Sequence, residues 1–103
     1  PLAYVGAYSA TKAALIQVTK SQSIELARYN ICVNALAPGY ILTDINRDQL
    51  EGETGDLLKK KIPLKRFATV DELDTIISML LNTNNTYMTG AVVAVDGGLS
   101  TGL

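Results

Sequence analysis

Residues 31–36 read ICVNAL, and residues 37–39 read APG. The first run is short, almost wholly apolar and β-branched at two positions, and Pro and Gly stop it directly afterwards. Such a run is typical of a parallel strand buried on both faces, because a strand with one wet face would alternate apolar and polar residues. This stretch therefore predicts a parallel sheet within an α/β fold.

Helices are predicted on both sides of this strand. Residues 7–29 contain neither Gly nor Pro and are rich in Ala, Leu, Gln, Lys and Glu, which favours a long helix. Its apolar residues spread over more than one face, which predicts cover on two sides. A second helix is indicated by apolar residues at the spacing of one helical face in segment 73–81. Thr69 and Glu72 form a capping box at its start.

A polar excursion and a last strand complete the order of elements. Residues 43–65 contain two glycines and the lysine run 59–61, which predicts short helical turns in a mobile excursion with the lysines on a solvated face. Residues 91–95 are apolar and end at the turn Gly97-Gly98, so they predict a second buried strand. Two strands joined by a helical crossover form a βαβ unit, but two strands are too few for an independently stable sheet. The predicted architecture is incomplete.

Composition excludes several classes of protein. The 103 residues carry a net charge of -1, so nucleic acid and anionic membranes are poor partners. The apolar runs fall far short of the ~20 residues that cross a bilayer, and no secretory pattern opens the chain, which predicts a cytoplasmic location. Cys32 has no cysteine to pair with and has apolar neighbours, so we expect it to be buried and structural. The absence of His excludes Ser-His and Cys-His nucleophiles and His-containing metal sites within these residues.

Tyr8 and Lys12 are the pair best placed for chemistry. They stand four residues apart, so on a helix both project from one face. A nearby cation favours phenolate and lowers a tyrosine pKa from about 10 toward the range useful in acid/base catalysis. Tyr8 could then give a proton to a carbonyl oxygen or take one from an alcohol. The same spacing occurs by chance on many helices, so the surrounding sequence has to decide.

The surrounding sequence resembles the short-chain dehydrogenases/reductases. Residues 8–15, YSATKAAL, look like the active-site helix of that family. Residues 31–39, with Thr43 four residues after Gly39, are similar to its next strand and cofactor loop. The family's closing pattern is matched by residues 62–67 (IPLKRF), the capped helix from Thr69, residues 88–90 (MTG) and residues 95–98 (VDGG). These blocks follow the family's order and spacing over nearly the whole chain.

The resemblance implies a fold and a site. The fold would be the carboxyl-terminal portion of a Rossmann-type doubly wound parallel sheet, with residues 1–103 forming a partial NAD(P)-binding domain that lacks its amino-terminal half. Tyr8 would be the general acid/base, and Lys12 would bind the nicotinamide ribose hydroxyls and lower the tyrosine pKa. The excursion would be the lid over the substrate. Four residues would line the nicotinamide end of NAD or NADP: Pro38, Gly39, Ile41 and Thr43.

No metal is predicted. Carboxylates cluster in the excursion, but they lack a fixed ligand spacing, and a solvated lid explains them better. The residues in question are Asp44, Asp48, Glu51 and Glu53.

Three functional hypotheses stay open at this point. The favoured one is a part of an oxidoreductase, inactive alone and completed by an amino-terminal segment, that moves hydride between NAD(P)(H) and a carbonyl or alcohol substrate. The glycine-rich turn and the residue that selects NAD or NADP would lie in that segment. The second is a truncated, non-catalytic relative that serves as an assembly module, and the third is a product without function. The resemblance also implies a homo-oligomer, and it leaves the substrate open.

Overall fold

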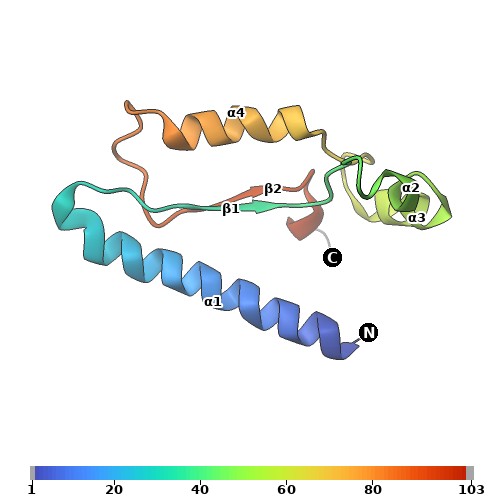
Figure 1. The fold of residues 1–103 in the computed structure, drawn as a ribbon, viewed down its shortest axis with the longest axis horizontal. Coiled ribbons are helices and arrows are strands. Elements are labelled where there is room, and N and C mark those ends of the chain that lie inside the picture. Colours follow the sequence, from blue (N-terminus) through green and yellow to red (C-terminus); the bar gives the residue numbers. More distant parts are fainter. Residues whose placement is uncertain (1, 102–103) are drawn as a thin grey trace. The chain divides into compact units, whose positions relative to one another are not determined.

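The computed structural model describes residues 2–101, with side chains from Ser9 to Thr101. Helices and strands follow one another as in Figure 1: α1 (Leu2–Leu26), β1 (Ala35–Pro38), α2 (Arg47–Leu50), α3 (Glu53–Lys61), α4 (Val70–Leu81) and β2 (Val92–Val95). The two strands are hydrogen-bonded neighbours and run in the same direction. This confirms the predicted α/β fold with a parallel sheet.

The chain forms two compact units. Residues up to Ala35 together with Thr83–Val93 make the first, and Leu36–Asn82 together with the residues from Ala94 onward make the second. Within residues 2–101, none of the helices combines the length and the apolar character that crossing a bilayer requires.

The first unit contains α1, which confirms the predicted long helix and extends it to Leu2. Its buried residues among those with described side chains are the small polar Thr19 and Ser23. Their hydroxyls donate to the carbonyl oxygens of Leu15 at 2.8 Å and Lys20 at 2.6 Å. Gly90 comes so close that an added Cβ would lie 2.9 Å from the Ser23 Oγ. Among the described side chains of α1, the most covered are therefore small and polar, and Ile16 and Leu26 are half-buried.

The first strand differs from the prediction in its bounds. The sequence indicated residues 31–36, whereas β1 runs from Ala35 to Pro38. The residues just before β1 are held by side chains: the Val33 N–H donates to Thr89 Oγ1, and Asn34 bonds Met88 O and the Ala91 N–H, each at 3.0 Å. The strand begins later than predicted because its partner strand begins only at Val92. The sequence of residues 31–36 does not show where that partner begins.

The predicted burial of both strands and of Cys32 is wrong for this chain. The residues of β1 are half-buried, those of β2 alternate between exposed and half-buried, and Cys32 is exposed. A parallel strand is covered on both faces only when strands and helices surround it. Here β1 has β2 as its one hydrogen-bonded neighbour in the described residues.

The excursion contributes to the core of the second unit. The short helical turns that the sequence predicted are α2 and α3. Leu50, Ile62 and Phe67 are buried and in contact, and three half-buried residues pack against them: Leu42, Leu58 and Leu99. Of the lysine run, Lys60 and Lys61 are exposed as predicted. Lys59 instead places its ammonium 5.2 Å from the centre of the Phe67 ring, a cation–π contact.

The start of α4 confirms the predicted capping box. The Thr69 N–H donates to Glu72 Oε1 at 3.0 Å, and the Thr69 side chain accepts from the helix backbone in return. Arg66 donates to both Glu72 carboxylate oxygens, at 2.7 and 2.8 Å. These bonds, first from Arg66 and then from the Thr69 backbone, lower the pKa of Glu72 to about 2.

Acid is therefore expected to loosen the start of α4. A carboxylate whose pKa is lower in the folded chain stabilises the fold fully above its ordinary value of 4.5, and this contribution disappears as the pH falls toward 2. Glu72→Gln removes the titrating group, so the urea midpoint should fall less between pH 5 and pH 2.5 than in the wild type, as followed by circular dichroism. A variant with the same pH slope as the wild type would contradict this account.

The chain turns sharply after β2, as Gly97-Gly98 predicted. Both glycines have positive φ, 65° and 93°. The Asp96 carboxylate accepts the Gly98 N–H at 2.9 Å and the Ser100 N–H at 3.0 Å. The hydrogen bond from the Ser100 side chain and these N–H groups lower the pKa of Asp96. The ionised Asp96 carboxylate therefore stabilises the turn.

Candidate active site

The segment after β1 is held close to the end of β2. The Gly39 N–H donates to Val95 O at 3.0 Å. A Cβ on Gly39 would lie 2.7 Å from Asp96 Cβ and 2.8 Å from Asp96 Cα, closer than real Cβ atoms come. Gly39 is thus required because two backbone segments approach closely at this position. This requirement is more specific than a strand-ending turn, which is all that the sequence alone supports.

Ile41 lies in a parallel bridge with Ala68. The Leu42 N–H donates to Ala68 O at 2.9 Å, and the Ala68 N–H donates to Tyr40 O at 3.0 Å. These bonds join Ala68 to the residues on either side of Ile41, and the backbone polar groups of successive residues in a strand point to opposite sides. Ile41 therefore turns its backbone polar groups away from Ala68, while the Leu42 side chain packs on the core of the second unit.

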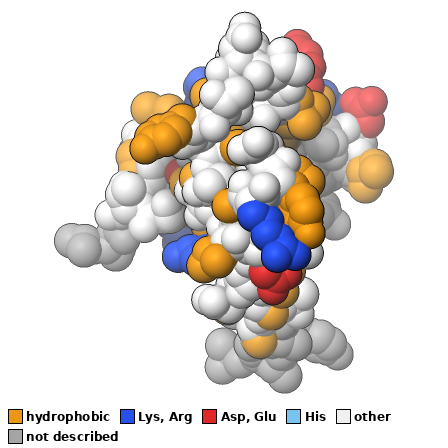
Figure 2. Space-filling view, turned by 90° about the vertical axis from the view of Figure 1, so that its left-hand side faces the viewer, with side chains coloured by type: hydrophobic (Ala, Val, Ile, Leu, Met, Phe, Trp, Pro, Cys, Tyr) orange, Lys and Arg blue, Asp and Glu red, His pale blue; other side chains and the backbone are white. Residues whose placement is uncertain are grey.

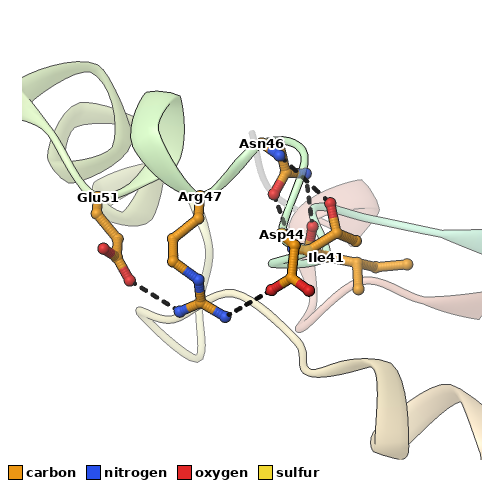
Figure 3. A network of polar contacts seen from close by, with 6 residues as sticks. Ile41, Asp44, Asn46, Arg47 and Glu51 are labelled. Carbon is orange, nitrogen blue, oxygen red and sulfur yellow. Dashed lines mark hydrogen bonds and ion pairs between the residues drawn. The ribbon is translucent and has the colours of Figure 1, made fainter.

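The side chain of Asn46 bonds the side of the loop that faces away from Ala68 (Figure 3). The Thr43 N–H donates to Asn46 Oδ1 at 2.7 Å, and Asn46 Nδ2 donates to Ile41 O at 2.8 Å. A longer contact of 3.4 Å joins the Asn46 N–H to Thr43 Oγ1. Sequence reasoning missed Asn46. The available signal was an amide three residues after Thr43, a spacing at which short polar side chains bond nearby backbone.

Arg47 lies between two carboxylates next to this loop (Figure 3). It contacts Glu51 Oε1 at 3.0 Å and Asp44 Oδ1 at 3.8 Å, and all three side chains are exposed. Exposed pairs of this kind add little stability. In the part of the chain with described side chains, no three His, Cys, Asp or Glu residues come together in a way that could hold a metal ion.

A hollow of about 640 Å³ opens beside the loop in the second unit. The loop lines one side of it with Leu42 and Thr43, and the start of α4 lines another with Thr69 and Val70. Its charged groups are those of Asp44, Arg47 and Asp71, with one more carboxylate than cation. An anionic phosphate is disfavoured there, because carboxylates repel it.

The predicted site residues fall into both units. Pro38 is the last residue of β1, and Gly39, Ile41 and Thr43 lie in the loop that follows it, all in the second unit. Tyr8 and Lys12 lie one turn apart in α1, in the first unit. The Lys12 side chain is exposed, and the Tyr8 side chain lies outside the described side chains.

Comparison with known proteins gives a consistent family. The family profile described as Enoyl-(Acyl carrier protein) reductase matches residues 2–100. A 3-oxoacyl-[acyl-carrier-protein] reductase of Aquifex aeolicus is 44% identical over 92 residues, which cover 89% of this chain and 37% of the relative. The chain thus spans little more than a third of the length of that relative.

Solved structures agree with the sequence comparison. A short chain dehydrogenase family protein from Francisella tularensis superposes with a TM-score of 0.84 at 32% identity, over 92% of this chain and 43% of that one. YwfH, an NADPH dependent reductase involved in bacilysin biosynthesis, superposes with a TM-score of 0.79 at 33% identity, over 88% of this chain and 38% of that one. The chain belongs to the short-chain dehydrogenase/reductase family of oxidoreductases, of whose members it matches a part.

Proposed function

We propose that residues 1–103 are the carboxyl-terminal part of one NAD(P)-binding domain, in an enzyme that interconverts a carbonyl compound and an alcohol. The observation that carries the proposal is the loop of Gly39, Ile41 and Thr43, which follows Pro38 at the end of β1 and is bonded on both sides. In open α/β sheets, ligands bind beyond the carboxyl ends of the strands. Tyr8 and Lys12, one turn apart on α1, supply the acid/base pair.

The loop suits the nicotinamide end of NAD(P). The carboxamide of that ring needs a donor and an acceptor, and Ile41 turns its backbone N–H away from Ala68, with the Thr43 hydroxyl two residues further on. The Lys12 side chain is exposed, and an ammonium is a donor of the kind that ribose hydroxyls accept. The pyrophosphate requires a glycine-rich turn at a helix start, which we assign to an amino-terminal segment.

The chemistry assigned to this chain is proton transfer. When bound, the reduced nicotinamide supplies a hydride to the carbonyl carbon. Tyr8 donates its phenolic proton to the carbonyl oxygen, so that the product is the alcohol, and it accepts that proton in the reverse direction. Lys12 holds the ribose and keeps a positive charge next to the phenol, which favours its ionised form.

A second candidate function rests on the outer faces of α1. Leu15 and Ile24 are 63% and 78% exposed, although both are apolar. Hydrophobic side chains, orange in Figure 2, lie on the surface of the chain. These faces need cover, which an amino-terminal segment or another subunit of a homo-oligomer would provide. A non-catalytic assembly module would use the same faces without binding NAD(P).

Cofactor binding separates the two functions. The "completed enzyme" is this chain joined to the amino-terminal segment of the Aquifex aeolicus reductase, the part of that relative that the chain does not cover. We expect the isolated chain not to quench or shift NADPH or NADH fluorescence, whereas the completed enzyme binds one of them and reduces a 3-oxoacyl thioester. The thioester is the first probe because that relative is named for such a substrate. If the completed enzyme folds but binds neither cofactor, the oxidoreductase proposal is wrong and the assembly function is favoured.

A further inference from the structure

We propose that Asn46 is a positioning residue whose side-chain amide holds the loop of residues 41–43 in the geometry that receives the nicotinamide end of the cofactor. The proposal rests on the proposed function, because it assigns that loop to the cofactor. It adds a residue outside the family pattern from which the loop was recognised.

Both ends of the Asn46 side-chain amide are hydrogen-bonded to the loop. Its oxygen accepts the Thr43 N–H at 2.7 Å, and its nitrogen donates to Ile41 O at 2.8 Å, so both ends are engaged by one short loop (Figure 3). Asn46 is half-buried, so water competes less for these bonds than at an exposed site. A single planar group thus fixes the separation and orientation of two backbone polar groups.

Ala68 and Asn46 bond opposite sides of the loop. The bonds to Ala68 hold Tyr40 and Leu42 on one side. The bonds to Asn46 hold Ile41 and Thr43 on the other side, the side to which the backbone polar groups of Ile41 point. Loss of the amide would leave the pairing with Ala68 intact and would loosen Ile41 and Thr43, the residues whose N–H and hydroxyl are assigned to the ligand.

Asn46 does not serve as an ordinary helix cap. Asn46 is the residue before α2, where an Asn side chain usually caps the helix. Here it makes no cap bond to α2 and turns back to the loop. The amide therefore serves the loop, and α2 begins without a side-chain cap.

The test measures binding and turnover separately in the completed enzyme. For Asn46→Ala we expect the Kd for NADPH or NADH to rise about tenfold and kcat to fall less than threefold. The reason is that the variant loses an interaction made equally in the bound and transition states, whereas Tyr8 and Lys12 are unchanged. Arg47→Ala is the matched control, because Arg47 is the next residue and bonds only exposed carboxylates. Its Kd should stay within twofold of the wild type.

A second readout follows the loop itself in the completed enzyme without cofactor. Exchange of the Thr43 amide proton, measured by NMR or mass spectrometry, should accelerate about tenfold in Asn46→Ala. It should stay near wild type in Asn46→Asp, which keeps the oxygen that accepts this proton but loses the donor to Ile41. The Asp variant should still weaken cofactor binding, because a carboxylate would face the Ile41 carbonyl.

The two readouts keep the failure of each proposal distinct. Unchanged Thr43 exchange in Asn46→Ala overturns the positioning role, and so does accelerated exchange with unchanged cofactor Kd. If the wild-type completed enzyme folds but binds no cofactor, the proposed function is wrong. The exchange experiment then still decides whether Asn46 holds the loop.

Discussion

Tyr8→Phe is expected to lower kcat of the completed enzyme about 1000-fold, within the range that general acid/base catalysis supplies. Phe keeps the ring but cannot donate a proton to the carbonyl oxygen. The Kd for the cofactor should change less than threefold, because the bonds assigned to the nicotinamide end come from the loop and Lys12. Steady-state turnover and fluorescence titration give the two quantities on the same preparation.

Lys12→Ala is the companion variant, because Lys12 is assigned two tasks. Loss of its ammonium should raise the cofactor Kd and lower kcat together, unlike loss of the Tyr8 hydroxyl. Thr11→Ala, a change on the same turn of α1, should leave both quantities within threefold of the wild type. A Tyr8→Phe variant with near wild-type kcat would show that another group moves the proton.

Gly55→Ala is expected to destabilise the second unit by about 3 kcal/mol, at the upper end of the usual cost of overpacking. An added Cβ would lie 1.7 Å from Leu50 O and 2.4 Å from Leu50 C. The nearby atoms are backbone, so no side-chain rotation relieves the overlap, and Leu50 belongs to the buried core. The sign is the reverse of that usual in a helix, where Ala is more favourable than Gly by about 1 kcal/mol.

Gly52→Ala is the matched control three residues earlier. Its added Cβ would come no closer than 4.0 Å to the nearest neighbouring atom, Asp48 O, so the change should stay within about 1 kcal/mol of the wild type. Urea denaturation followed by circular dichroism measures both variants. A Gly55→Ala chain at least as stable as the wild type would show that α2 and α3 do not pack as described.

Local signals in the sequence predicted the helices well. The absence of Gly and Pro between residues 7 and 29 predicted α1, and the spacing of apolar residues with Thr69 and Glu72 predicted α4 together with its cap. These features depend on residues three or four positions apart, which the sequence displays directly. The order of helices and strands then sufficed for the α/β fold.

Features that depend on distant partners could not be predicted in this way. The bounds of β1 depend on where β2 begins, nearly sixty residues later, and the exposure of Cys32 depends on which segments cover it. The polar excursion was expected to be solvated. Instead Leu50 and Ile62 of the excursion are buried with Phe67, and the three are too far apart in sequence for their contact to be visible as a pattern.

The candidate site likewise contains residues that the sequence reveals and contacts that depend on the folded chain. Tyr8, Lys12 and the residues of the loop were found by resemblance, and their roles stay predictions. The structure adds what the resemblance left out: the pairing of Ile41 with Ala68 and the amide of Asn46 that spans the loop. Neither follows from the motif, since both depend on how the chain folds back after it.

Hydride transfer itself is the most direct test of the account. The completed enzyme is incubated with a 3-oxoacyl thioester or another ketone and with NADPH or NADH carrying deuterium at the transferring position of the nicotinamide. We predict one deuterium on the new carbinol carbon of each alcohol formed, and almost no product with Tyr8→Phe. Oxidation of the cofactor without deuterium in the alcohol, or equal yields from the two proteins, would contradict it.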